Sequence, residues 1–181
     1  RDDRSGGRPP GVDSRLGREA TARLWKNIFA GTASARFHRP EGDWGIGLNE
    51  YARANLKAMS MLFEEFDIFD ARPHPDLLSS YVAAPSASMQ AYCMAEIGET
   101  YAVYFPEGRY TIQLDPWVYA ETVRVRWLNI DEGTWSEPEV RSITWNSGLD
   151  QWGHRGRIRL TTPSNSSAVA LVEITTMKGA R

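Results

Sequence analysis

The sequence predicts an α+β chain in which a helical first part is followed by an antiparallel β-sandwich. In the first part, over residues 1–80, apolar residues recur every three to four positions, as they do in amphipathic helices. From Met89 onward apolar residues alternate with polar ones, and turn-forming Gly, Pro and Asn residues divide the alternating runs into short segments. We therefore expect two parts, residues 1–80 and residues 81–181.

Composition and charge exclude several classes of protein. The 181 residues are 41% hydrophobic and 24% charged, which is typical of a globular protein, and the formal net charge is −2. Nucleic-acid binding usually requires a basic excess, so we expect no nucleic-acid partner. No stretch approaches the ~20 apolar residues of a membrane span. Cys93 is the single cysteine, which rules out an intrachain disulfide, and we expect no metal and no cofactor.

The first predicted helix covers residues 14–29. Its apolar stripe combines i+4 steps with two aromatic neighbours, through Leu16, Ala20, Leu24, Trp25, Ile28 and Phe29. Asp13 or Ser14 offers an N-cap, and Gly31 stands where a helix would end in a left-handed residue. The chain starts at Arg1 and not at Met, which we interpret as a piece whose true N-terminus lies upstream.

A strand and a second helix follow. Residues 32–38 are short and small-residue-rich, and we expect one buried strand there. The second helix is predicted over residues 50–66, with Asn49 as its cap and a buried face formed by Ala52, Leu56, Met59, Leu62 or Phe63, and Phe66. The prolines of residues 72–75 end it, and a short helical turn is expected at residues 76–78. This order is the tail of an α/β repeat and leaves apolar faces uncovered.

Seven strands are predicted in the second part, over residues 89–96, 100–105, 110–114, 122–129, 141–145, 157–162 and 168–175. Alternation places Val123, Val125 and Trp127 on one face of their strand. The last strand is apolar on both faces, so we expect it to be central. The strand at residues 100–105 also has two apolar faces. We expect one to meet the sandwich core and the other to lie near the helix at residues 49–66.

Motifs in the second part resemble a known domain. Three motifs follow one another along the chain. The first is a Tyr-x-Val-Tyr strand before a Pro/Gly turn, formed by Tyr101, Val103, Tyr104, Pro106 and Gly108. The others are an Arg-Trp strand, Arg126 and Trp127, and an Asp…Gly…Trp hairpin, Asp131, Gly133 and Trp135. This pattern resembles the C-terminal β-sandwich that carries the family name collagen-binding domain of a collagenase. The name is a label, and the sequence offers no physical support for collagen as a ligand.

In that family the sandwich follows a (β/α)8 barrel similar to apiosidase-like glycoside hydrolases. The resemblance implies that residues 19–29 are the barrel's seventh helix, residues 32–38 its eighth strand and residues 49–66 its last helix. It also implies that the two catalytic carboxylates lie upstream, so no catalytic residue is assigned in this chain. The intact protein would then hydrolyse a carbohydrate substrate, this chain alone would be inactive, and a secreted or periplasmic location is favoured.

Two groups of residues are candidates for ligand contacts. Arg36 and His38 share one face of their predicted strand and Trp44 follows in the loop, a set that suits sugar stacking and hydroxyl contacts. The competing interpretation is a polar cluster inside the barrel with a packing Trp. Trp117 and Trp152 stand in predicted loops and are candidates for glycan binding. A non-enzymatic module for polysaccharide or matrix binding, and a purely structural sandwich, are the alternative functions.

Overall fold

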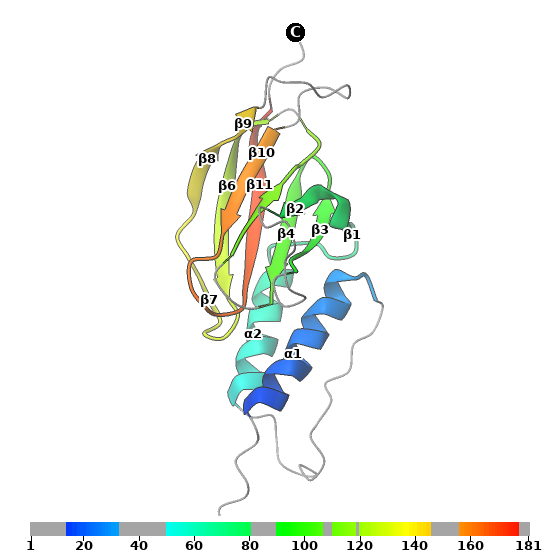
Figure 1. The fold of residues 1–181 in the computed structure, drawn as a ribbon, viewed down its shortest axis with the longest axis vertical. Helices are drawn as coiled ribbons and strands as arrows, with labels where there is room; N and C mark the ends of the chain where they lie inside the picture. Colours follow the sequence, from blue (N-terminus) through cyan, green and yellow to red (C-terminus); the bar gives the residue numbers. More distant parts are fainter. Residues whose placement is uncertain are drawn as a thin grey trace, which may run out of the picture.

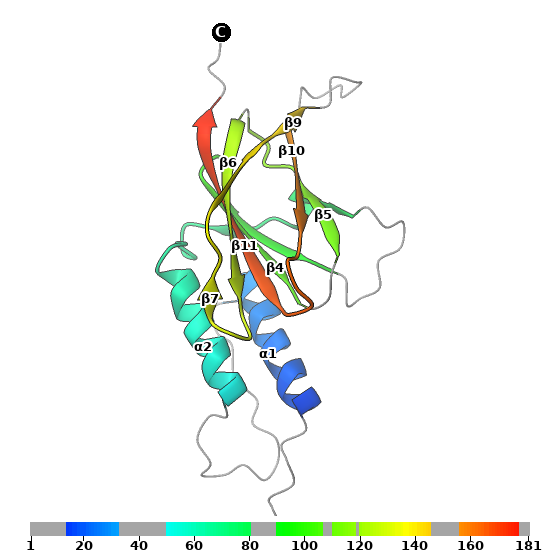
Figure 2. The ribbon, with the colours of Figure 1, turned by 90° about the vertical axis from the view of Figure 1, so that its left-hand side faces the viewer.

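Two helices lie against one face of a large antiparallel sheet, and a smaller sheet covers its other face (Figures 1 and 2). This computed structural model describes residues 14–32, 50–80, 90–106, 110–118, 120–145 and 156–177. The α+β class and the predominantly antiparallel pairing expected from the sequence are confirmed.

The large sheet has seven strands within the described part of the chain. Their order is β1 (Arg72–Pro73), β3 (Tyr92–Glu96), β4 (Thr100–Phe105), β11 (Ala168–Met177), β6 (Ala120–Asn129) and β7 (Thr134–Trp135), and β8 (Glu139–Ser142) also pairs with β6. The small sheet, counted over the same residues, has four strands in the order β2 (Leu78–Ser80), β5 (Thr111–Leu114), β10 (Gly156–Thr161) and β9 (Thr144–Trp145).

Strand β11 occupies the centre of the large sheet, as its two apolar faces predicted. It pairs with β4 on one side and with β6 on the other, so that Ala170 lies opposite both Val103 and Trp127. Alternation then sends the side chains of β11 into two separate cores. Ala170 and Val172 belong to the core between the sheets, whereas Val169 and Leu171 belong to the core under the helices.

The two helices are α1 (Ser14–Phe29) and α2 (Glu50–Phe63). Gly31 follows α1 with φ +74°, the left-handed geometry expected there. Helix α2 ends three residues earlier than predicted. Beyond residue 63 the Glu65 amide donates to the Leu62 carbonyl, three residues back, at 3.1 Å, so the chain tightens into a turn, and the Asp67 carboxylate then accepts from the amides of Phe69 and Asp70.

The predicted buried face of α2 is only partly correct. Leu62 is buried and Phe63 is not, which resolves the choice between them. Leu56 was expected in the core and is instead 36% exposed, because the sheet covers a narrower arc of the helix than its apolar stripe. Residues 75–77 form the short 3-10 helix η1 (Pro75–Leu77), one residue before the expected turn.

Strand β4 has the two covered faces that the sequence predicted, and both helices contribute to the cover of one of them. Tyr101, Val103 and Phe105 enter the core between the sheets. On the other face Tyr104 stacks on Trp25 of α1, with ring centroids 5.6 Å apart. Helix α1 lies over β3 and β4, and α2 lies over β6. Helix α2 lies near this face as well, because its Ala58, Met59 and Leu62 belong to the same buried cluster as Ala102 and Tyr104, so the expected nearness of the second helix to β4 is confirmed.

Several predicted features lie outside the described residues. They are the strand at residues 32–38 and the candidate ligand residues Arg36, His38, Trp44 and Trp152. The boundary between residues 80 and 81 stays a prediction. Strands β1 and β2 precede it and pair with β3 and β5, which follow it.

Candidate functional site

Trp117 is the one predicted ligand residue that the described part of the chain contains. It stands between β5 and β6, is 42% exposed and has φ +55°. A bulky residue at positive φ is strained by roughly 1–3 kcal/mol, and such strain persists only where surrounding contacts enforce it. Contacts that restrain the backbone here come from the Asp115 carboxylate and from the buried Tyr101.

Hydrogen bonds fix the peptide group between Pro116 and Trp117, on the N-terminal side of the Trp117 α-carbon. The Asp115 carboxylate accepts from the Trp117 amide at 3.2 Å, and the Tyr101 hydroxyl donates to the Pro116 carbonyl at 2.6 Å. The same hydroxyl accepts from the Gly98 amide at 2.8 Å. Burial raises the pKa of Tyr101 to about 12, so the hydroxyl keeps the proton that it donates to Pro116. The indole is thus displayed on a rigid support.

Two polar side chains lie beside this indole. The His74 ring meets Trp117 edge-on, with ring centroids 6.3 Å apart, and His74 Nδ1 lies 3.5 Å from a carboxylate oxygen of Asp76. We call His74, Asp76, Asp115 and Trp117 the Trp117 corner. An exposed aromatic face bordered by an imidazole and carboxylates can stack on a sugar ring and contact its hydroxyl groups.

A second candidate lies where β6 ends. A depression with a cavity volume of about 210 Å³ is lined by residues of the β6–β7 hairpin and of the segment before β11, among them Trp127, Asn129, Glu132, Thr134, Trp135 and Ser164. We call it the β6–β7 depression. The sequence analysis placed Trp127 in the Arg-Trp strand and Trp135 in the Asp…Gly…Trp hairpin, and it did not predict this depression.

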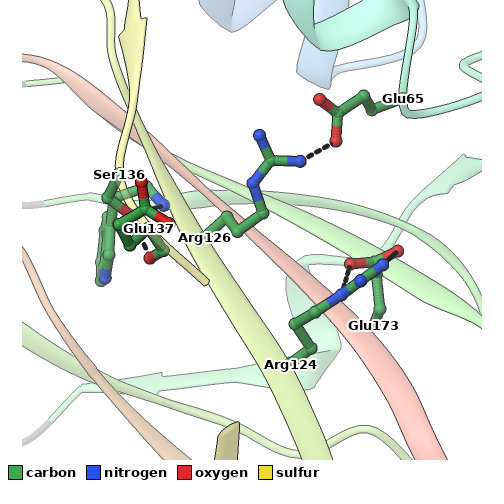
Figure 3. Close-up of polar contacts among 7 residues, drawn as sticks. Glu65, Arg124, Arg126, Ser136, Glu137 and Glu173 are labelled. Atoms are coloured by element: carbon green, nitrogen blue, oxygen red, sulfur yellow. Dashed lines mark hydrogen bonds and ion pairs between the residues drawn. The ribbon is translucent and has the colours of Figure 1, made fainter. Parts of the chain in front are cut away.

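One ion pair attaches this hairpin to the helix layer, and a second joins β6 to β11 (Figure 3). Arg126 pairs with Glu65, which follows α2, and its guanidinium lies 4.6 Å from the centre of the Trp135 ring. The Arg124 guanidinium donates two hydrogen bonds of 2.7 Å to the Glu173 carboxylate of β11, and these bonds raise the pKa of Arg124. Both arginines point to the helix side of the large sheet, so Trp135 is held from that side.

The turn of the hairpin also contacts α2. Gly133 has φ +61°, and a Cβ built on it would lie 3.2 Å from Cδ of Lys57. Below the turn, the Ser136 hydroxyl accepts from the Trp127 amide and donates to the Glu137 carbonyl, both at 2.9 Å (Figure 3). The walls of the depression are therefore fixed before any ligand arrives.

Three further features of the described residues concern metal ligands, the thiol and membrane spans. No group of three or more His, Cys, Asp and Glu side chains among them could hold a metal ion. Cys93 is buried, and burial raises the pKa of its thiol far above the usual range, which keeps it protonated and unreactive. Neither described helix is long and apolar enough to cross a membrane.

Comparison with known proteins supports the fold. No family model and no curated protein matches the chain. A glycoside hydrolase family 5 structure from Bacteroides vulgatus matches with a TM-score of 0.63 and 13% identity over 87% of this chain. A second solved structure, a glycoside hydrolase, matches with a TM-score of 0.61 and 12% identity over 88% of it. This chain spans 36% and 37% of those two chains.

The likeness is to part of each glycoside hydrolase and concerns the fold. The match covers 87% of this chain. The strands all lie within residues 72–177, which are a smaller share of the chain, so the match also includes part of the helical sequence before residue 72. The glycoside hydrolase side of the sequence resemblance is thus supported at the level of fold. Neither structure is named for a collagen-binding domain, and that part of the resemblance stays a prediction.

Proposed function

We propose that this chain is the accessory end of a glycoside hydrolase-type protein. In this proposal α1 and α2 are the last helices of a (β/α)8 barrel, the two sheets form a β-sandwich packed on them, and the catalytic carboxylates lie upstream. The helices and the large sheet share one buried cluster, which includes Trp25, Leu62, Tyr104 and Leu171. Such a continuous core suits a sandwich that holds the barrel's end in place.

The observation that carries this proposal is an apolar face of α2 that the described residues leave exposed. Leu56 and Phe63 are 36% and 38% exposed and stand seven residues apart, so they lie on one side of the helix. In a barrel, a flanking helix packs against its neighbours as well as against the strands. The proposed occupant of this face is the upstream barrel.

The double variant Leu56→Asp/Phe63→Asp tests this proposal. In the 181-residue chain we expect a loss of about 1–2 kcal/mol in the free energy of unfolding, because Leu56 and Phe63 are only about one third exposed and lose part of their apolar contacts. In a longer natural chain that includes the upstream sequence, we expect a loss of about 3 kcal/mol or more, because two carboxylates would be buried. Urea denaturation followed by circular dichroism measures both.

Val140→Asp is the matched control, because Val140 is apolar and 67% exposed on β8. It should change the two chains equally. Equal, small effects of the double variant in both chains would contradict a covering barrel. The 181-residue chain should also fail to hydrolyse aryl glycosides, and turnover by it would contradict the upstream placement of the catalytic carboxylates.

The second candidate function is polysaccharide binding at the Trp117 corner. Its support is the strained, fixed and exposed indole with His74 and Asp76 beside it. Backbone strain of this kind is often found at ligand-binding sites, and preorganisation lowers the cost of ligand binding.

Trp117→Gly separates binding from stability. Glycine adopts φ +55° without strain, so the variant should be no less stable than the wild type. We expect about tenfold weaker polysaccharide retention, or about 1.4 kcal/mol, in affinity gels that contain soluble glycans. Phe69→Ala is the control, because Phe69 is an exposed aromatic residue outside the corner, and its retention should be unchanged. Wild-type mobility that no glycan alters would exclude this function.

A further inference from the structure

We infer that the free edge of β8 pairs with the same edge of a second copy of this chain, so that the two large sheets become continuous. The inference goes beyond the proposed function, because it concerns a partner of the sandwich itself. Strand β8 pairs with β6 on one side, and no strand among the described residues pairs with its other side. In Figure 1 β8 forms one border of the sandwich. An unpaired strand edge is a template for a further strand.

Strand β8 is the longest edge strand in the described part of the chain. Strands β1, β7 and β9 have two residues each and β2 has three, whereas β8 has four, Glu139–Ser142. It also carries a strongly exposed apolar side chain, Val140, at 67%. Short length, prolines and unpaired charges usually protect an edge. Here the only proline is Pro138, before the strand, and the two charges of the strand form an ion pair with each other.

The backbone of β8 turns the hydrogen-bonding groups of two residues outward. The Ile143 amide donates to the Glu121 carbonyl at 3.0 Å, and these two residues lie opposite each other when the register of β8 and β6 is continued. In an antiparallel ladder hydrogen-bonded pairs alternate with non-bonded pairs, so Val140 and Ser142 occupy the non-bonded positions. Their N–H and C=O groups therefore point away from β6, to the free edge.

The side chains of β8 lie on two sides of the strand. The β6 partners of Glu139 and Arg141 belong to the core between the sheets, so both charged side chains lie on the side of the small sheet. There Arg141 Nη2 donates to a Glu139 carboxylate oxygen at 2.6 Å, and Arg141 Nη1 donates to the Arg159 carbonyl of β10 at 3.1 Å. Val140 stands on the opposite side, across from Arg124. Along the edge the order is thus an acid, an exposed apolar residue and a base.

This order is self-complementary in an antiparallel pair centred on Val140. There Val140 lies opposite its counterpart and exchanges two backbone hydrogen bonds with it. Glu139 of each copy lies opposite Arg141 of the other, and opposite charges across two strands stabilise their pairing. The Ser142 amide reaches the Pro138 carbonyl of the second copy, while Pro138 has no N–H to donate and so ends the ladder. One patch thus serves both copies, as two-fold symmetry requires.

Charge selects both the register and the partner. A shift of the pair by two residues in one direction places Arg141 opposite its own counterpart, and a shift in the other direction does the same with Glu139. Like charges directly opposite each other are destabilising, so the register centred on Val140 is favoured. A neutral peptide strand would gain the backbone hydrogen bonds alone, whereas a second copy also brings an acid to each base. The edge therefore suits a second copy better than an unrelated strand.

Sedimentation velocity of the 181-residue chain at concentrations from about 5 to 500 µM tests the inference. We expect the sedimentation coefficient to rise from that of a monomer to that of a dimer, with a Kd of about 100 µM, as for a small interface. Val140→Pro removes the outward N–H and leaves the bonds to β6 intact. This variant should stay monomeric, with an unchanged circular dichroism spectrum. Ser142→Ala keeps the backbone groups and should dimerise like the wild type.

Two charge variants make the test specific for a second copy. Glu139→Arg leaves two bases in β8 and Arg141→Glu leaves two acids, so each variant alone should self-associate about tenfold more weakly. A mixture of the two variants again sets an acid opposite each base, and its association should return to within about threefold of the wild type. Three results would overturn the inference: a wild type that is monomeric at every concentration, a dimer that Val140→Pro leaves intact, and a mixture that associates no better than its components.

None of these results bears on the accessory role, which the α2 variants test separately. At the roughly 1 µM of an unfolding experiment, a Kd of about 100 µM leaves the chain monomeric. Val140 therefore serves as a surface control in those experiments, and its part in pairing is seen only at high concentration.

Discussion

Replacing Trp25 by alanine is expected to lower the free energy of unfolding by about 3–5 kcal/mol. Trp25 is buried near the C-terminal end of α1 and stacks on Tyr104 of β4 with ring centroids 5.6 Å apart. Its indole N–H donates to Asn55 Oδ1 of α2 at 3.0 Å. One side chain thus connects both helices and the large sheet, and its removal leaves a cavity where the three elements meet.

The polar part of this contact adds to the cost. Asn55 is buried, and its NH₂ group donates to the Tyr51 carbonyl at 3.0 Å, which leaves its oxygen dependent on Trp25. Trp25→Phe keeps most of the apolar volume and leaves only the Asn55 oxygen without a hydrogen-bond donor. We therefore expect a smaller loss in the free energy of unfolding, of about 1–3 kcal/mol. The difference between the two variants separates packing from hydrogen bonding.

Urea denaturation with far- and near-ultraviolet circular dichroism measures both variants. A single transition, moved to lower urea without a change in its slope, is the expected result, because helices and sheet share one core. An early loss of helical signal that leaves the sheets folded would contradict that coupling. It would also remove the physical basis for a sandwich that supports the end of a barrel.

The long strands could be predicted from the sequence because a period of two is a local property. Strand β4 was expected over residues 100–105 and is found at Thr100–Phe105. The inward positions Val123, Val125 and Trp127 of β6 are also confirmed. Each of these strands carries enough alternating residues for its faces to be read without knowing its partners.

Short strands could not be predicted, because two or three residues show no period. Strand β1 is Arg72–Pro73, in a segment whose prolines indicated a linker, and it pairs through its position beside β3. The strand expected over residues 141–145 is divided. Strand β8 pairs with β6 in the large sheet and β9 pairs with β10 in the small one, so the chain changes sheets at Ile143.

The two candidate sites differ in what the sequence could disclose. Trp117 was identifiable as an aromatic residue in a loop, but its positive φ and its support by Tyr101 are tertiary facts. The β6–β7 depression joins a hairpin to Ser164, about thirty residues further on, and no local pattern links those segments. The predicted contacts of Arg36, His38 and Trp44 lie outside the described residues and stay predictions.

The second large effect is expected at Leu171, in the centre of β11. It is fully buried, lies opposite Ala102 of β4 and Arg126 of β6, and faces the helices. Leu171→Ala should lower the free energy of unfolding by about 2–5 kcal/mol, because strands on both sides prevent the sheet from closing the cavity. Val172→Ala, on the opposite face of the same strand, removes a smaller side chain from the core between the sheets.

Comparison of these two neighbours measures how much the helix layer contributes to stability. If the helices are an integral layer, Leu171→Ala is at least as destabilising as Val172→Ala, since leucine loses more volume in an equally closed environment. Val140→Ala, on the exposed surface of β8, should stay within about 0.5 kcal/mol and serves as the baseline. A Leu171→Ala effect as small as this baseline would mean that the helices leave the sheet in solution. The face under them would then be free, and the accessory role would lose the buried cluster on which it depends.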